Sequence, residues 1–153
     1  YYKVGTLGSH LLSNGHAGLP EGRLLLKVDI EGAEWDIFAQ ADLHDLRRFR
    51  QIVIELHDPY INGLADVVRL KQRVAMMRRL LEAFVVVHVH PNNLCWEDSM
   101  CACVEVTLVN RVFADEIPCH PPQRHLLDAP NEPGRVDVDI GDLFGSLATL
   151  SLT

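Results

Sequence analysis

The sequence lacks an excess of positive charge, and it lacks any long apolar run. Its formal net charge is -7 at pH 7. A chain with this charge has no broad basic surface that would neutralise the phosphates of a nucleic acid. No stretch reaches the roughly 18 consecutive apolar residues typical of a membrane-spanning helix. We therefore expect neither a nucleic acid nor a membrane as a partner of this segment.

The sequence also lacks the paired cysteine motifs of a structural zinc site. The four cysteines are Cys95, Cys101, Cys103 and Cys119, and no two of them form a CxxC pair. Cys101 and Cys103 are predicted to share one face of a strand. We expect reduced thiols that pack as small apolar side chains, with a disulfide as the alternative, and we expect no metal ion.

What is present is the composition of one globular domain. The chain has 153 residues, of which 48% are hydrophobic and 23% are charged. Four segments have the pattern of strands: residues 24–30, 51–56, 85–90 and 102–109. Residues 24–30 form a nearly continuous apolar run, which is typical of a strand covered on both faces.

Helical patterns connect these strands. Short, medium and long helices are predicted at residues 6–15, 33–46 and 64–84. In the long helix, one apolar stripe is predicted to face the core: Val67, Leu70, Val74, Met77 and Leu81.

The order of strands and helices predicts the α/β class. A single helix between residues 24–30 and 51–56 predicts that these two strands are adjacent and parallel in one sheet. The short loop before residues 102–109 favours antiparallel pairing with residues 85–90. Residues 1–117 would form this body, and residues 118–153, rich in proline and acid, would form an extended tail packed on it.

Polar side chains leave the predicted strands where such sheets bind their ligands, beyond the carboxyl ends. The candidate site residues are Asp29, Glu31, Glu55, His57, His90 and Asn92. We expect four of them, Asp29, Glu55, His57 and His90, to converge at one end of the sheet. Two structural alternatives stay open: Asp29 and Glu31 cap the helix near Ala33, and His88 is a core histidine.

The segment from Leu26 to Trp35, LKVDIEGAEW, resembles the signature of the FkbM-type, or methyltransferase-like, family of S-adenosylmethionine-dependent methyltransferases. That signature reads lysine, hydrophobic, aspartate, hydrophobic, glutamate, glycine, any residue, glutamate. Residues 51–57 resemble the next strand of the family. Residues 88–93 and 104–109 resemble its closing strands.

The resemblance implies a Rossmann-like class I sheet with an antiparallel closing strand. In that family, the first strand and its glycine-rich turn bind S-adenosylmethionine, and a later acidic strand, matched here by residues 24–30, lies beside the methyl group. No Gly-x-Gly turn after a strand precedes residue 24, since Gly5 and Gly8 lack that strand. We expect the C-terminal half of such a domain, which alone binds the cofactor weakly or not at all.

The function implied by the resemblance is methyl transfer to a small or polar acceptor. Methyl transfer needs alignment and a group that accepts a proton. One alternative is a non-catalytic half-domain that binds a partner, or a second copy, through an exposed sheet edge. A weaker alternative is a metal-dependent hydrolase, with the ligands His88, His90, Asp29 and His57. It is weaker because the usual scaffold of such a hydrolase is a barrel of about 250 residues, which is longer than this chain. The compartment is left open.

Overall fold

The computed structural model describes residues 5–58, 67–94, 96–97, 100–101, 103–114 and 124–138. Its helices are α1 (Leu7–Ser13), α2 (Glu34–Gln40), α3 (Leu43–Leu46) and α4 (Val67–Ala83). The strands are β1 (Leu24–Val28), β2 (Phe49–His57), β3 (Phe84–Pro91), β4 (Trp96–Glu97), β5 (Met100–Cys101) and β6 (Cys103–Asn110). Within the described ranges, no helix is long and apolar enough to cross a bilayer.

The main sheet has four strands in the order β1-β2-β6-β3. β1 pairs with β2 in parallel, and β6 is antiparallel to both β2 and β3. The predicted parallel pair, the antiparallel pairing of the last two strands and the α/β class are therefore confirmed. Because β3 runs in the same direction as β1 and β2, the carboxyl ends of all three lie at the end of the sheet where β6 begins.

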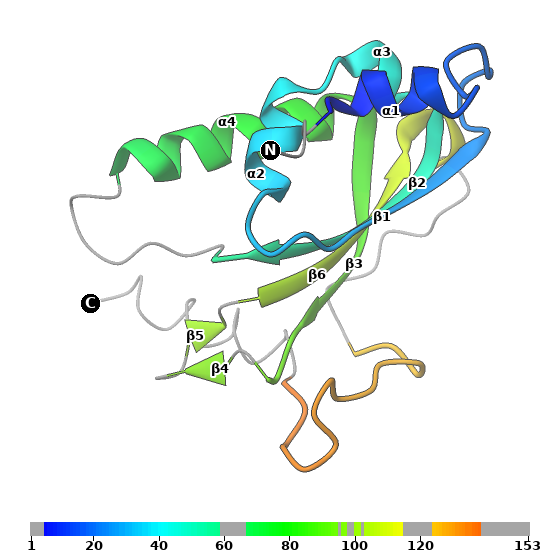
Figure 1. Ribbon diagram of the computed structural model, residues 1–153. Coiled ribbons are helices and arrows are strands. Elements are labelled where there is room, and N and C mark those ends of the chain that lie inside the picture. The colour runs from blue at the N-terminus through cyan, green and yellow to red at the C-terminus, as the bar shows by residue number, and fades with distance from the viewer. Residues whose placement is uncertain are drawn as a thin grey trace.

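The helices gather on one face of this sheet, and residues 124–138 lie on the other side (Figure 1). The core fills the space between helices and sheet. Its most deeply buried apolar side chains, each less than 2% exposed, are Phe38, Phe84, Leu46, Ile52, Ile54, Leu80 and Leu108. Alternate residues of β2 and β6 supply this layer, as the two-residue period of a strand requires.

β1 differs from the prediction of a strand covered on both faces. Leu25 is 65% exposed, and Lys27 is exposed as well. Leu24 and Leu26 are partly buried and pack against the core. β1 is an outer strand of the described sheet, and the helices cover only one of its faces, so the apolar run does not indicate burial on both sides.

The single helix predicted for residues 33–46 is two helices. Asp42 has extended backbone angles between α2 and α3, and its carboxylate accepts a hydrogen bond of 2.8 Å from the N–H of His44. The apolar spacing continues across the break, which is why periodicity alone did not show it. A short acidic side chain that caps the second helix makes the break stable.

The face of α4 that packs on the core also differs from the prediction. The buried residues are Arg73, Met76, Leu80 and Ala83. Three members of the predicted stripe, Val67, Leu70 and Val74, are instead 39%, 44% and 40% exposed. α4 carries apolar residues on two adjoining faces, so the helical period could not select the face that meets the sheet.

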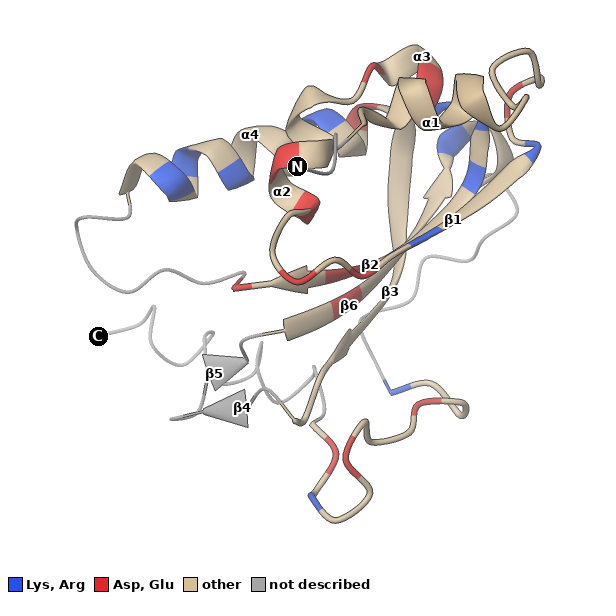
Figure 2. Cartoon of the chain, viewed as in Figure 1, with Lys and Arg blue, Asp and Glu red and all other residues tan. Residues whose placement is uncertain are grey.

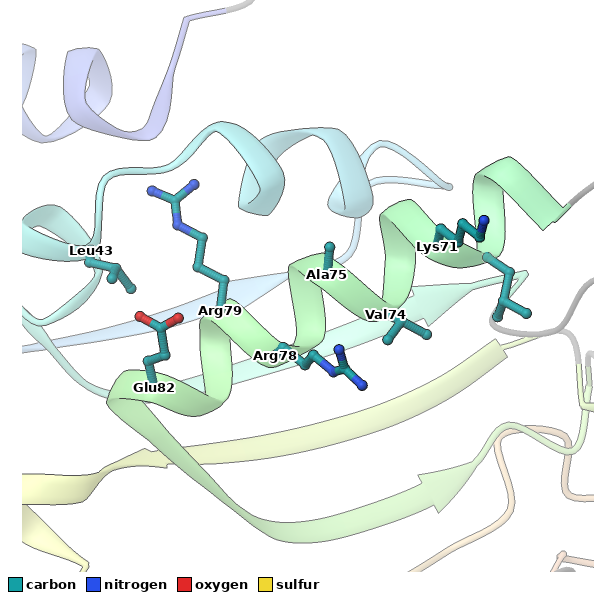
Figure 3. A pocket seen from close by; sticks show the side chains of 8 residues that line it. Leu43, Lys71, Val74, Ala75, Arg78, Arg79 and Glu82 are labelled. Atoms are coloured by element: carbon teal, nitrogen blue, oxygen red, sulfur yellow. The ribbon is translucent and has the colours of Figure 1, made fainter.

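Leu70 and Val74 line a hollow of about 680 Å³ on the outer side of α4. Figure 3 shows Val74, Ala75 and the basic side chains of this hollow along α4, with Leu43 of α3 beside them. None of the six candidate site residues lines it. The hollow is therefore separate from the carboxyl ends of the strands.

Residues 124–138, the described part of the predicted tail, form no helix or strand. Asp128 Oδ1 lies 2.8 Å from His88 Nε2. His88 is 30% exposed in this pair, so it is not the core histidine of the structural alternative. Burial raises the pKa of Asp128. The hydrogen bond from the N–H of His125 and the neighbouring His88 ring together outweigh this effect, so the pKa of Asp128 lies below its ordinary value.

Some predictions fall outside the described residues. These are the start of the long helix at 64–66, tail residues 118–123 and 139–153, and the side chains of Cys95, Cys101 and Cys119. The backbone of Cys101 belongs to β5, whereas Cys103 begins β6. The prediction that Cys101 and Cys103 share one strand is therefore wrong.

The corrected face of α4 can be tested with two leucines of the same helix. We expect Leu80→Ala to lower the free energy of unfolding by about 2–5 kcal/mol, because it leaves a cavity at a fully buried position. We expect the matched control Leu70→Ala, at an exposed position, to change it by less than about 1 kcal/mol. Urea unfolding measures both, and equal losses would contradict the assignment of the faces.

Candidate functional site

The turn that leaves β1 has an unusual backbone. Glu31 has a φ of 56° and Gly32 a φ of 101°, in the left-handed region that a residue with a side chain rarely adopts. Such a conformation persists only where surrounding contacts fix it. Glu34, at the start of α2, provides these contacts: its carboxylate accepts hydrogen bonds from the N–H of Ile30 at 2.9 Å and of Gly32 at 3.0 Å.

The same carboxylate joins this turn to the end of β2. Glu34 is 0% exposed, and its Oε1 lies 3.1 Å from His57 Nδ1. The same Oε1 atom accepts the N–H of Ile30, so Glu34 is the acceptor and Nδ1 the donor in this pair. The other ring nitrogen, Nε2, lies 3.3 Å from Glu31 Oε2. His57 therefore links a buried carboxylate to one that is exposed.

Neighbouring side chains brace the backbone at the end of β2. The indole Nε1 of Trp35 donates a hydrogen bond of 2.7 Å to the carbonyl of His57. The guanidinium of Arg73 lies 4.8 Å from the centre of the Trp35 ring and donates to the carbonyl of Asp58. Asp58 has a φ of 47°. The helices α2 and α4 thus fix the backbone on which His57 is placed.

The structure brings three of the candidate residues together at the exits of β1 and β2. One ligand atom from each of Asp29, Glu31 and His57 lies within 4.8 Å of the others. The side chains of Asp29 and Glu31 are 43% and 87% exposed. α2 begins after Ala33 without a side-chain cap, so neither acid caps it and that alternative is wrong. These carboxylates are open to a ligand.

Glu55 and Asn92 form a second, buried part of the same end of the sheet. Asn92 Nδ2 donates a hydrogen bond of 2.8 Å to Glu55 Oε1, and the N–H of Asn92 donates to the carbonyl of Cys103 at 3.0 Å. Glu55 and Asn92 are 9% and 6% exposed. One ligand atom from each of Glu55, His57 and Cys103 also lies within 4.8 Å of the others.

His90 has different partners from the other candidates. It lies on β3, separated from β2 by β6, and its Nε2 is 3.1 Å from Asp137 Oδ1 in the tail. Arg124 holds the other oxygen of Asp137 at 2.9 Å. All four residues of the predicted convergence lie at the end of the sheet where β1, β2 and β3 finish, and Glu105 of β6 is opposite both Glu55 and His90. His90 Nδ1 lies 3.5 Å from Glu105 Oε2, so His90 is bound by β6 and the tail.

The ligand set proposed for a hydrolase is also not assembled. His88 and His90 pair with the tail carboxylates of Asp128 and Asp137 and not with Asp29 or His57. Among the described residues, the groups of three or more side chains that could hold a metal ion include neither His88 nor His90. The two histidines of β3 hold the tail on the sheet.

Charge is unevenly distributed around the site. Figure 2 shows acidic residues in the turn after β1, on β2 and on β6, whereas basic residues are prominent on α4. Acidic side chains at an exposed edge favour ligands that carry positive charge or donate hydrogen bonds. The edge formed by Asp29 and Glu31 has this property.

Sequence reasoning missed Glu34, Trp35, Arg73 and Cys103 as parts of the site. Glu34 and Trp35 lie inside the segment that resembles the family signature, but nothing in a single sequence shows that Glu34 is fully buried against His57. Arg73 had the pattern of a solvated basic residue on a helix. Cys103 was interpreted as a small apolar residue, and only strand register shows that it lies opposite His57.

Comparison with protein families gives a match. Residues 20–99 match the family model of the methyltransferase FkbM domain, which is more than half of the chain. The matched residues contain β1, the turn held by Glu34, β2 and Asn92. No curated protein and no solved structure matches the chain. The chain therefore belongs to the FkbM methyltransferase domain family.

Proposed function

We propose that this chain serves S-adenosylmethionine-dependent methyl transfer and that its exposed carboxylates hold the methyl acceptor. The observation that carries the proposal is the FkbM domain match over the residues that build the site. The strand order β1-β2-β6-β3, with an antiparallel strand inserted before the last one, is compatible with the closing half of a Rossmann-like methyltransferase sheet.

The described residues fit the acceptor side of such a site and not the cofactor's glycine turn. A Cβ added to Gly5 would lie 2.5 Å from Ser9 Oγ, and one added to Gly8 would lie 2.6 Å from Asp45 Oδ2. These glycines thus pack closely against α1 and α3 and do not line an open turn after a strand. No Gly-x-Gly turn that follows a strand and could receive the cofactor is found among the described residues.

Asp29 and Glu31 are suited to bind an acceptor hydroxyl or amine. Both carboxylates are open to solvent, and they meet within 4.8 Å of His57. A carboxylate that accepts a hydrogen bond from the acceptor both orients it and receives its proton as the acceptor forms the bond to carbon. The acceptor class is therefore a small polar molecule with a hydroxyl or amino group.

His57 is a positioning residue in this account. Its Nε2 lies 3.3 Å from Glu31 Oε2, while Nδ1 is held by buried Glu34. Glu34 thus holds the ring beside the Glu31 carboxylate, whose side chain is 87% exposed. A protonated His57 donates from Nε2 to Glu31 and so orients this carboxylate for the acceptor.

A second candidate function is a non-catalytic module that binds a partner or a second copy through its sheet edge. β1 is an outer strand of the described sheet, and Leu25 on it is 65% exposed. Proteins usually cover such an edge. The assay below separates the two functions, because a binding module would transfer no methyl group.

Asp29→Asn tests the acceptor site. In an active methyltransferase that contains this chain, we expect this change to lower methyl transfer by at least about 100-fold, because the proton acceptor is lost. Tm should move by less than about 2 °C, because the side chain is half-exposed and its ion pair with Lys27, at 4.0 Å, is weak.

The measurement is transfer of a tritiated methyl group from S-adenosylmethionine to a panel of small polar alcohols and amines, with thermal unfolding in parallel. Asp36→Asn, an exposed acid in the first turn of α2, is the matched control and should keep full activity. Wild-type activity in Asp29→Asn, or a fold that collapses, would contradict the assignment.

The cofactor expectation has a separate test. We expect calorimetric titration of the 153-residue chain with S-adenosylmethionine to show weak binding or none, because the glycine turn and the helix N-terminus that should receive the cofactor are not found among the described residues. Binding at micromolar concentration would show that other residues of this chain hold the cofactor.

A further inference from the structure

Glu55, His57 and Cys103 lie together without a joint role in the proposed methyl transfer. β2 and β6 are antiparallel with His57 directly opposite Cys103, and Glu55 precedes His57 by two residues, so the three side chains leave the same face of the sheet. One ligand atom from each lies within 4.8 Å of the other two.

These three side chains supply the donor types that bind zinc. Zinc takes thiolate sulfur, imidazole nitrogen and carboxylate oxygen at about 2.0–2.3 Å, which places tetrahedral donor atoms roughly 3.3–3.8 Å apart. The present atoms lie within 4.8 Å of one another and would have to move closer to reach that spacing. Magnesium and calcium prefer oxygen donors alone, so the thiol and the imidazole select a softer metal.

Hydrogen bonds to neighbouring residues already hold two of the donors. Residues behind the ligands of a metal site support those ligands in the same way. Buried Glu34 accepts the Nδ1 hydrogen of His57, which leaves Nε2 for a metal ion. Asn92 donates to Glu55 Oε1, which leaves Oε2 for the metal. A carboxylate behind a ligand histidine fixes its tautomer and its orientation and raises its basicity as a ligand.

We propose that Glu55, His57 and Cys103 bind one divalent transition metal ion of the zinc type. Glu31 adjoins this cluster, since its Oε2 lies 3.3 Å from His57 Nε2 and its side chain is 87% exposed, so a fourth ligand could enter from this side. Three protein ligands with an accessible fourth position are typical of zinc sites that exchange a ligand. This site goes beyond the proposed methyl transfer and replaces the expectation, made from the sequence, that no metal binds.

Cobalt titration of the full 153-residue chain tests the site directly, because Co²⁺ takes the place of zinc and its spectrum reports the ligands. We expect one ion to bind per chain with a near-ultraviolet thiolate-to-cobalt band and visible bands of tetrahedral geometry. Zn²⁺ should displace the ion and remove both signals, whereas an excess of Mg²⁺ should not.

Variants identify the donors. We expect Cys103→Ser to lose the near-ultraviolet band, His57→Gln and Glu55→Gln to weaken binding at least tenfold, and Glu34→Gln to weaken it about 10–100-fold through His57. The control His16→Gln removes an exposed histidine outside the cluster and should bind as the wild type does. Circular dichroism of each variant shows whether it is folded.

Two results would overturn the proposal. One is the absence of saturable one-to-one binding to the wild-type chain. The other is a thiolate band that persists in folded Cys103→Ser, which would place the metal on another cysteine. Neither measurement needs a cofactor or a methyl acceptor, so failure of the metal site and failure of the proposed methyl transfer are distinguishable.

Discussion

The carboxylate of Glu34 is the contact on which the site depends. A charged group with 0% exposure is stable only if hydrogen-bond donors surround it, and Glu34 has three: the N–H of Ile30, the N–H of Gly32 and the ring of His57. These donors belong to the turn after β1 and to the end of β2. One buried acid thus fixes the positive φ of Glu31 and the orientation of His57 together.

Two surfaces with a proposed function adjoin this contact. On the outer side, Asp29 and Glu31 project into solvent and are suited to a hydroxyl or amine. On the inner side, Glu55, His57 and Cys103 offer mixed donors to a metal ion. His57 touches both surfaces, so the state of its Nε2 affects both. Tail residues 124–138 bind the histidines of β3 on the face opposite the helices, and they also hydrogen-bond Asn93 and Leu94, which follow Asn92 at this end of the sheet.

The sequence allowed the order of elements and the parallel β1–β2 pair to be predicted, and it placed the candidate residues at the exits of the strands. Those features follow from local period and from connection length. The buried face of α4 and the partners of His90 depend on contacts between distant segments. The break at Asp42 rests on a local cap, but the apolar spacing continues across it. Asp137 lies 47 positions from His90, and no local pattern indicates that they pair. Glu34 was missed for the same reason, since its burial is set by β2.

A double-mutant cycle on Glu34 and His57 tests the central contact most directly. The free energy of unfolding is measured by urea denaturation for wild type, Glu34→Gln, His57→Gln and the double variant, with Asp36→Asn and His57→Gln as the control cycle. The account predicts a coupling energy of about 1–3 kcal/mol between Glu34 and His57, as for a buried hydrogen bond to a charged group. It predicts none in the control cycle. A coupling within about 0.5 kcal/mol of zero between Glu34 and His57 would contradict it.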